Sequence, residues 1–107
     1  MGITVSKSHN TITIKLPERF DYQSRNEFVN SYKTSPANTI FIIDFSDVLF
    51  LDSSALGLLL LFRDVVSKKQ GNENESHKIE NIIFMNCQPK ILRLFQMSQF
   101  TEIFNIL

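Results

Sequence analysis

Near the start of the chain, hydrophobic and polar residues alternate with a period of two. Residues 12–16 carry isoleucine or leucine at every second position, with threonine or lysine between, which indicates a strand with one buried face. The segment Ser8-His9-Asn10 favours a turn, so Ile3 and Val5 are expected in the partner strand of a hairpin. Pro17 ends the second strand because proline has no backbone N–H to donate.

The next segments switch between helical and strand patterns. Residues Asp21 to Lys33 follow helical spacing, and Asp21 or Ser24 is suited to cap the first turn. Thr39 to Phe45 is almost wholly apolar and does not alternate, which predicts a strand at the centre of a sheet and covered on both faces. A second short apolar run follows at Val48 to Leu51.

A long apolar helix is predicted from Ser53 to about Lys69, with Gly71 as its C-terminal cap. Its apolar residues cover more than one side of the helix, so it is either deeply buried or presents a second apolar face to a partner. These residues are Leu56, Leu58, Leu59, Leu60, Leu61, Phe62, Val65 and Val66.

The remaining pattern completes an alternation of strands and helices. The polar segment Asn72 to Lys78 is expected to be a surface loop, and Ile79 to Met85 a buried strand. Gln88-Pro89 opens a third helix, and residues 103–106 form a short last strand or a packed tail. The order β-β-α-β-α-β-α-β predicts an α/β fold with mainly parallel pairing in the middle.

Composition narrows the class of protein. A length of 107 residues fits one domain, 1–107, and 11 basic against 11 acidic residues leave no basic excess for nucleic acid or an anionic membrane surface. The strongest apolar run, Leu56 to Phe62, is far shorter than the roughly 20 residues that span a membrane, so no membrane insertion is expected. Cys87 is the only cysteine, which fits a reducing, cytoplasmic setting.

Catalytic and metal-binding patterns are weak. The three glycines form no phosphate-binding loop, and no nucleophile stands in a recognisable elbow motif, so we expect no enzyme activity and no cofactor. Asp44, Asp47 and Asp52 are better interpreted as a strand-end group, a loop group and a helix cap than as a metal site. No metal is expected.

The segment Asp52-Ser53-Ser54 stands where a predicted strand meets a predicted helix. Ligands and chemistry gather at such junctions in α/β sheets, and the free N–H groups of a helix start favour an anion there. The commoner role of such residues is simple helix capping. Asp52 already suits that role, and Ala55 and Gly57 keep the adjacent surface low enough for another protein to approach.

Residues 48–57, Val-Leu-Phe-Leu-Asp-Ser-Ser-Ala-Leu-Gly, closely resemble the signature of the STAS family, which includes the anti-sigma factor antagonists. Asp44-Phe45-Ser46 is similar to the pattern that closes the family's central strand, and residues 89–98 to its late helix. Phe20-Asp21 stands where the family begins its first helix. The resemblance covers nearly the whole chain and implies a mixed sheet of four to five strands with helices packed mainly on one side.

The resemblance also implies a function. Such proteins are phosphorylated by a serine kinase that is also the anti-sigma factor and has a histidine-kinase-like ATPase fold. A PP2C-type phosphatase reverses the modification. The implied acceptor is Ser53, with Asp52, Ser54, Ala55, Gly57, Asp21 and Asp44 in supporting or interface positions.

The sequence departs from the family pattern in places. Ala55 replaces the commonest glycine, the loop from Asn72 to Lys78 is longer than in compact members, and Arg19-Phe20-Asp21-Tyr22 lacks the Gly-Glu-Leu-Asp form. These differences bear on the choice of partner more than on the fold. The alternative function is a STAS subunit of a lipid or anion transport complex that is not phosphorylated.

Overall fold

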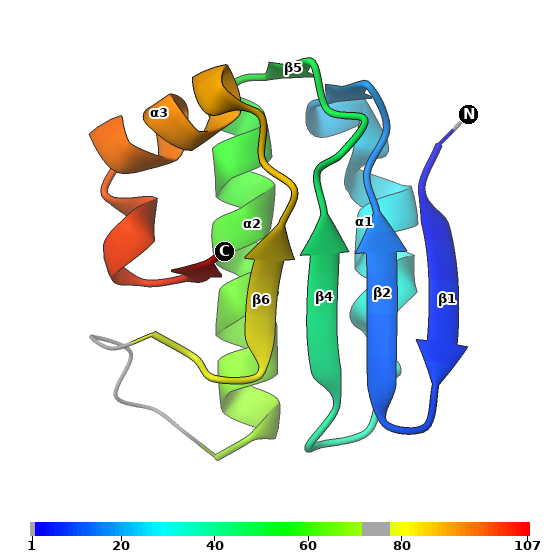
Figure 1. The fold of residues 1–107 in the computed structure, drawn as a ribbon. Coiled ribbons are helices and arrows are strands. Elements are labelled where there is room, and N and C mark those ends of the chain that lie inside the picture. The colour runs from blue at the N-terminus through cyan, green and yellow to red at the C-terminus, as the bar shows by residue number, and fades with distance from the viewer. Residues whose placement is uncertain (1, 72–77) are drawn as a thin grey trace.

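A five-stranded mixed sheet lies at the centre of the structure, a computed structural model that describes residues 2–71 and 78–107. Its strand order is β1-β2-β4-β6-β7 (Figure 1). The strands are β1 (Thr4–Ser8), β2 (Thr11–Lys15), β4 (Ile40–Asp44), β6 (Ile82–Met85) and β7 (Asn105–Ile106). The first pair is antiparallel and the other three pairs are parallel, which confirms the hairpin and the parallel middle that the sequence predicted.

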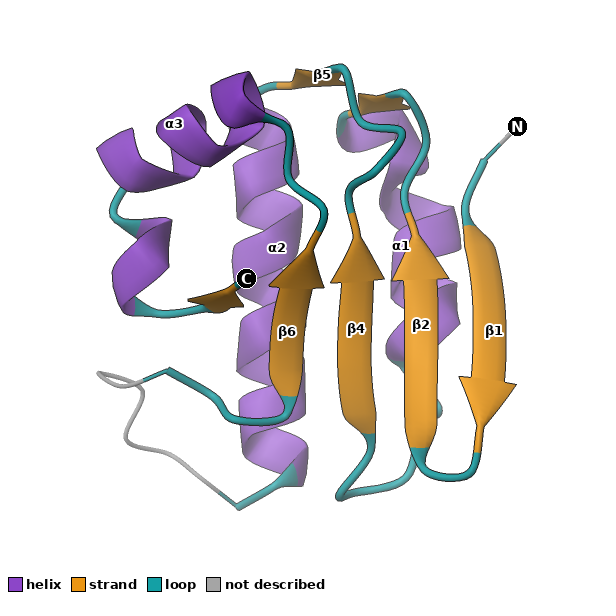
Figure 2. Cartoon of the chain, viewed as in Figure 1, coloured by secondary structure: helices purple, strands orange, loops and turns teal. Residues whose placement is uncertain are grey.

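Three helices connect these strands. They are α1 (Arg25–Tyr32), α2 (Ser53–Lys69) and α3 (Pro89–Met97), and α1 and α2 lie together on one side of the sheet (Figure 2). The bounds of α2 match the prediction, and Gly71 follows it with a φ of +72°, the left-handed conformation that ends helices and favours glycine. The first predicted helix is divided, because a 3-10 turn at Tyr22–Ser24 precedes α1.

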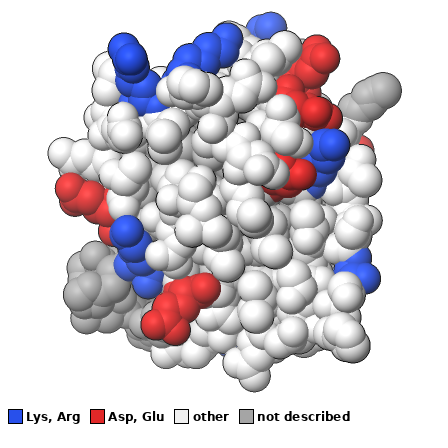
Figure 3. All heavy atoms as spheres, in the orientation of Figure 1, with Lys and Arg blue, Asp and Glu red and all other residues white. Residues whose placement is uncertain are grey.

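The central strand is covered on one face only, so the prediction of two covered faces is wrong. Phe41 and Ile43 are no more than 1% exposed, whereas Ile40 and Ile42 on the opposite side are half-buried. No described helix covers that side (Figure 2), and Figure 3 shows its middle to be free of charged side chains. Ile42 is partly shielded by its neighbours in register, Thr13 and Ile83, which explains how an apolar strand tolerates the open face.

Aromatic rings fill most of the space between the sheet and the helices. One cluster joins α1, α2 and β4, where the ring of Phe62 lies 5.2 Å from that of Phe41 and 5.4 Å from that of Phe28. A second cluster joins α3 to β6, with Phe95 5.5 Å from Phe84. Tyr32 belongs to the first cluster, and its buried hydroxyl has no hydrogen-bond partner among the described residues.

The C-terminal ends of α1 and α2 are joined by one lysine. The Nζ atom of Lys69, in the last turn of α2, donates to the carbonyl oxygens of Lys33 and Ser35 at 2.8 Å each and of Tyr32 at 3.3 Å. These carbonyls lie at or just beyond the end of α1, where helices leave their acceptors unpaired. A cation also suits the negative end of the helix dipole, so Lys69 stabilises both termini at once.

A second, two-stranded sheet lies next to the start of α2. It pairs β3 (Arg19–Phe20) with β5 (Phe50–Leu51) in parallel, with Phe20 opposite Leu51. The sequence predicted an apolar run at Val48 to Leu51 but not its pairing. The predicted loop Asn72 to Lys78 falls mainly outside the described residues, and in the described chain no helix is both long and apolar enough to cross a membrane.

Candidate functional site

The start of α2 is built around the carboxylate of Asp52. This residue has the extended backbone of a helix N-cap, and its Oδ1 accepts the backbone N–H of Ala55 at 3.0 Å and the Oγ–H of Ser54 at 2.7 Å. The hydrogen bond from Ser54, followed by that from Ala55, lowers the pKa of the Asp52 carboxyl. The capping role expected for Asp52 is therefore present in the structure, and Ser54 is engaged in the same cap.

Ser53 differs from both of its neighbours. It is exposed, and its hydroxyl makes no hydrogen bond with any residue in 2–71 or 78–107. Because it occupies the first position of α2, the unpaired N–H groups and the positive end of the helix dipole are close to it. Of the three residues in the Asp52-Ser53-Ser54 segment, Ser53 is the one whose polar group is free to react.

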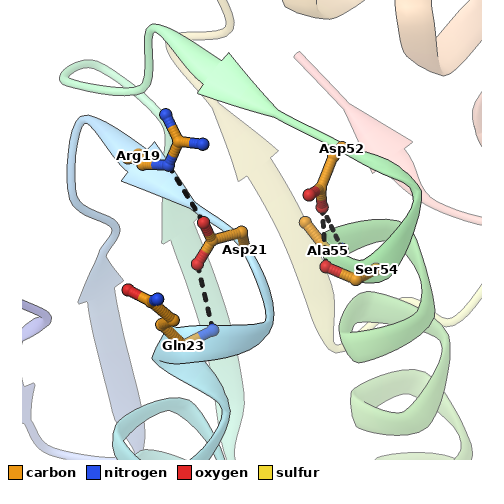
Figure 4. Close-up of polar contacts among 6 residues, drawn as sticks. All are labelled: Arg19, Asp21, Gln23, Asp52, Ser54 and Ala55. Carbon is orange, nitrogen blue, oxygen red and sulfur yellow. Dashed lines mark hydrogen bonds and ion pairs between the residues drawn. The ribbon is translucent and has the colours of Figure 1, made fainter.

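A second helix cap lies beside the first. Asp21 caps the 3-10 turn that leads into α1, where its Oδ1 accepts the N–H of Gln23 and its Oδ2 accepts the Nε–H of Arg19, both at 3.0 Å. Asp21 and Asp52 each follow a paired residue of β3 and β5, so the two-stranded sheet sets the two caps on neighbouring segments (Figure 4). Two helix starts thus open toward the same end of the molecule.

Arg19 is a site residue that the sequence did not reveal. Its guanidinium group lies 4.2 Å from the centre of the Phe50 ring and also pairs with Asp21. One side chain therefore links β3 to β5 through the cation–π contact and also holds the capping residue Asp21 through the ion pair. The only sequence signal was the arginine directly before Phe20-Asp21, and its partner Phe50 is 31 positions away, so no local pattern indicated the contact.

Asp44 lies apart from the Ser53 group. It ends β4, where its Oδ1 accepts the Nδ2–H of Asn86 at 3.0 Å and the N–H of Ser46 at 2.9 Å. Partial burial acts to raise the pKa of this carboxyl, but the hydrogen bonds from Asn86 and Ser46 outweigh it and the net direction is down. Among the described residues Asp44 makes no hydrogen bond or ion pair with Asp52 to Ala55, so its role here is to join the ends of β4 and β6.

An exposed apolar surface continues from Ser53 along α2. Gly57 is exposed, and Leu60 and Leu61 are 44% and 37% exposed, although neighbouring positions of the helix are buried. We call Ser53, Gly57, Leu60 and Leu61 the outer face of α2. A Cβ added to Gly57 would meet nothing within 4 Å, so no contact within the described chain requires glycine there. This confirms the second apolar face of the helix that the sequence predicted as one of two alternatives.

Comparison with known proteins shows which family this chain resembles. The family model described as STAS domain matches residues 2–107. A STAS-domain containing protein of Pseudomonas aeruginosa (strain UCBPP-PA14) is 32% identical over an alignment of 109 positions, which covers 99% of this chain and 99% of that protein.

Solved structures agree in fold at lower identity. An anti-sigma-factor antagonist (STAS) domain protein from Planctomyces limnophilus has a TM-score of 0.78 at 17% identity, covering 99% of this chain and 90% of that one. The Bacillus cell fate determinant SpoIIAA in its phosphorylated form has a TM-score of 0.66 at 18% identity, covering 99% and 91%. The five-stranded sheet, the helices on one side and the match across residues 2–107 lead to one conclusion: the chain belongs to the STAS domain family.

Proposed function

We propose that this protein is a non-enzymatic binding switch of the anti-sigma factor antagonist type, with Ser53 as the phosphate acceptor. The observation that carries the proposal is the free, exposed hydroxyl of Ser53 at the first position of α2, next to an Asp52–Ser54 pair that already forms the cap. SpoIIAA, a relative in fold, has been solved in a phosphorylated form, which supports a phosphoswitch in this family.

The helix start is suited to carry a phosphate. A phosphoserine brings about −1.5 to −2 charges and three acceptor oxygens at pH 7. The N–H groups and dipole of α2 stabilise such an anion, while the carboxylate of Asp52 beside it opposes full neutralisation. The fold is therefore expected to tolerate the modification and to keep most of the added charge on the surface.

The switch acts through the outer face of α2. An unmodified Ser53 is a small neutral group beside Leu60 and Leu61, so a partner is able to cover it together with these leucines. With a phosphate in place, the same contact buries a charge that lacks a partner, which costs several kcal/mol. A loss of about 3 kcal/mol is roughly a hundredfold in affinity, enough to release the partner.

The partners follow from the family. We propose a serine kinase that is also the anti-sigma factor, with a histidine-kinase-like ATPase fold, and a PP2C-type phosphatase. The unmodified protein binds the kinase and frees what the kinase held, in a cytoplasmic partner-switching pathway. The whole chain, 1–107, acts as one domain in this scheme, and its output is a sigma factor or another protein held by the kinase.

The acceptor is tested by incubating the protein with its cognate kinase and ATP and mapping the phosphate by mass spectrometry. We expect one phosphate on Ser53, none on the Ser53→Ala variant, and full labelling of the matched control Ser54→Ala. Full labelling of Ser53→Ala would refute the assignment.

The switch is tested separately by calorimetry with the kinase. Ser53→Asp is expected to weaken binding, and equal affinity for wild type and variant would contradict the switch. Unmodified Ser53 in cells, together with co-purification of a permease or transport ATPase, would support the transport-subunit alternative instead.

A further inference from the structure

A cleft of about 670 Å³ lies beside the start of α1 and is separate from Ser53. None of Asp52, Ser53 and Ser54 lines it. Its charged and hydroxyl-bearing lining residues are Glu18, Arg19, Asp21, Ser24, Glu27 and Asp47. The volume is within the range of small-ligand sites, and four carboxylates against one guanidinium make the lining acidic.

The carboxylates of this cleft are unequally neutralised. Asp21 is satisfied by Arg19 and by the N–H of Gln23, and Asp47 lies 3.6 Å from the Nζ of Lys15. Glu18 and Glu27 have no ion pair with any described residue.

The positions of these two glutamates are nevertheless restricted by their surroundings. The Glu18 carbonyl accepts the N–H groups of Leu49 and Phe50 at 2.8 and 3.0 Å, and the carboxylate of Glu27 lies so close to Gly2 that a Cβ there would collide with it. Two glutamates without an ion pair among the described residues therefore line the same cleft, Glu18 on a hydrogen-bonded backbone and Glu27 on α1.

Ser24 provides a second, independent sign of a ligand. It is only 9% exposed, yet it makes no side-chain cap and its hydroxyl has no hydrogen-bond partner among the described residues. The Tyr32 hydroxyl is the one described side-chain polar atom that is both sealed from solvent and unpaired. The Ser24 hydroxyl is therefore reached by solvent, and Ser24 is one of the residues that line the cleft.

We infer that this cleft binds an organic cation with several N–H donors, an alkylguanidinium or alkylammonium group. Carboxylates only accept hydrogen bonds, and the Ser24 hydroxyl accepts one as well. Arg19 and Lys15 already pair with Asp21 and Asp47, so the acceptors of Glu18, Glu27 and Ser24 are the ones left without a positive donor among the described residues. In residues 2–71 and 78–107 no three acidic, histidine or cysteine side chains are close enough together to hold a metal ion. A guanidinium spreads its charge over a planar fork and reaches carboxylates that are too far apart for a metal.

The test is a titration of the ¹⁵N-labelled protein with agmatine, which carries one guanidinium and one ammonium group, followed by NMR. We expect saturable shifts at the amides of Gln23, Ser24 and Glu27. The Glu18→Gln, Glu27→Gln double variant is expected to bind about tenfold more weakly and Ser24→Ala about threefold. The matched control is the Glu80→Gln, Glu102→Gln double variant, which makes the same charge change at exposed glutamates that do not line the cleft. It is expected to keep wild-type affinity.

The cation comes either from a free small molecule or from an arginine side chain of a protein. Repeating the titration with N-acetyl-Gly-Arg-Gly amide distinguishes these two sources. Binding of agmatine alone assigns the cleft to a free small molecule, and equal binding of the peptide assigns it to an arginine side chain of a protein; both support the cationic site. Dissociation constants weaker than about 10 mM for both probes, or equal weakening in the control variant, would overturn the inference. None of these outcomes depends on Ser53 phosphorylation.

Discussion

Replacing Gly57 by alanine is expected to stabilise the fold and to weaken partner binding. Gly57 lies inside α2, four residues after its start, and is exposed. In an exposed helix interior glycine is less favourable than alanine by about 0.8–1.0 kcal/mol. Because an added Cβ meets nothing within 4 Å, no clash offsets this gain. The unfolding free energy should therefore rise by about 0.8 kcal/mol and the melting temperature by about 3–6 °C.

The opposite effect is expected at the proposed interface. A methyl group at position 57 stands on the outer face of α2, one helical turn from Ser53, where a partner that packs on Leu60 approaches closely. Gly57→Ala should therefore bind the kinase more weakly although it is more stable. A higher unfolding free energy together with a lower affinity for the kinase distinguishes a residue that contacts the partner from one that only supports the fold.

Urea unfolding followed by circular dichroism measures the first effect, and calorimetry with the kinase measures the second. Gly71→Ala is the matched control, because Gly71 has a φ of +72° and alanine there is expected to destabilise the protein by about 1 kcal/mol. A Gly57→Ala protein that is less stable than wild type would refute the structural reasoning. A more stable variant with unchanged kinase affinity would refute the interface.

Three further predictions concern stability, each measured by urea or thermal unfolding. Tyr32→Phe removes a buried hydroxyl without a partner in the described chain, so it should leave stability unchanged or raise it by about 1 kcal/mol; a clear loss would mean that the hydroxyl is hydrogen-bonded. Lys69→Met leaves the carbonyls at the end of α1 without their shared donor and should cost about 1–3 kcal/mol, whereas Lys68→Met, at an exposed lysine, should cost much less. Asp44 and Asp52 have lowered pKa values in the folded protein, so the unfolded chain binds more protons at acidic pH; their contribution is complete above about pH 4 and is lost as the pH falls through the folded pKa values. An Asp44→Asn, Asp52→Asn double variant should show a weaker fall in stability below about pH 4, and an unchanged fall would contradict the assignment.

The main elements were predictable because their signals are local. The alternation at residues 12–16 depends on one buried face, and the bounds of α2 depend on Asp52 before it and Gly71 after it. The sheet of four to five strands with helices on one side came from the family resemblance, and five strands are present. The prediction that the central strand is covered on both faces failed because partial shielding by neighbouring strands lets isoleucine occupy an open face.

The unpredicted features depend on contacts between distant segments. The pairing of Arg19–Phe20 with Phe50–Leu51 involves two residues on each side, too few to leave a periodic signal. The acceptors of Lys69 lie at the end of another helix, α1, more than 30 positions away, so no local pattern indicates the contact. At the start of α2 the family resemblance implied Ser53 as the acceptor, and the structure adds the Asp52–Ser54 hydrogen bond that engages the neighbouring serine in the cap.

The unequal attachment of the two ends of α2 has a consequence for local opening. The last turn is held by Lys69 to the end of α1, so the amide hydrogens there should exchange slowly and together with those of α1. The first turn is held by the Asp52 cap, the buried side chain of Ala55 and a two-residue strand, with no side-chain bond to another helix among the described residues, so it should open at a lower free energy. An enzyme that needs the Ser53 segment clear of the helix is thus able to draw out one turn while the remainder of the domain stays folded.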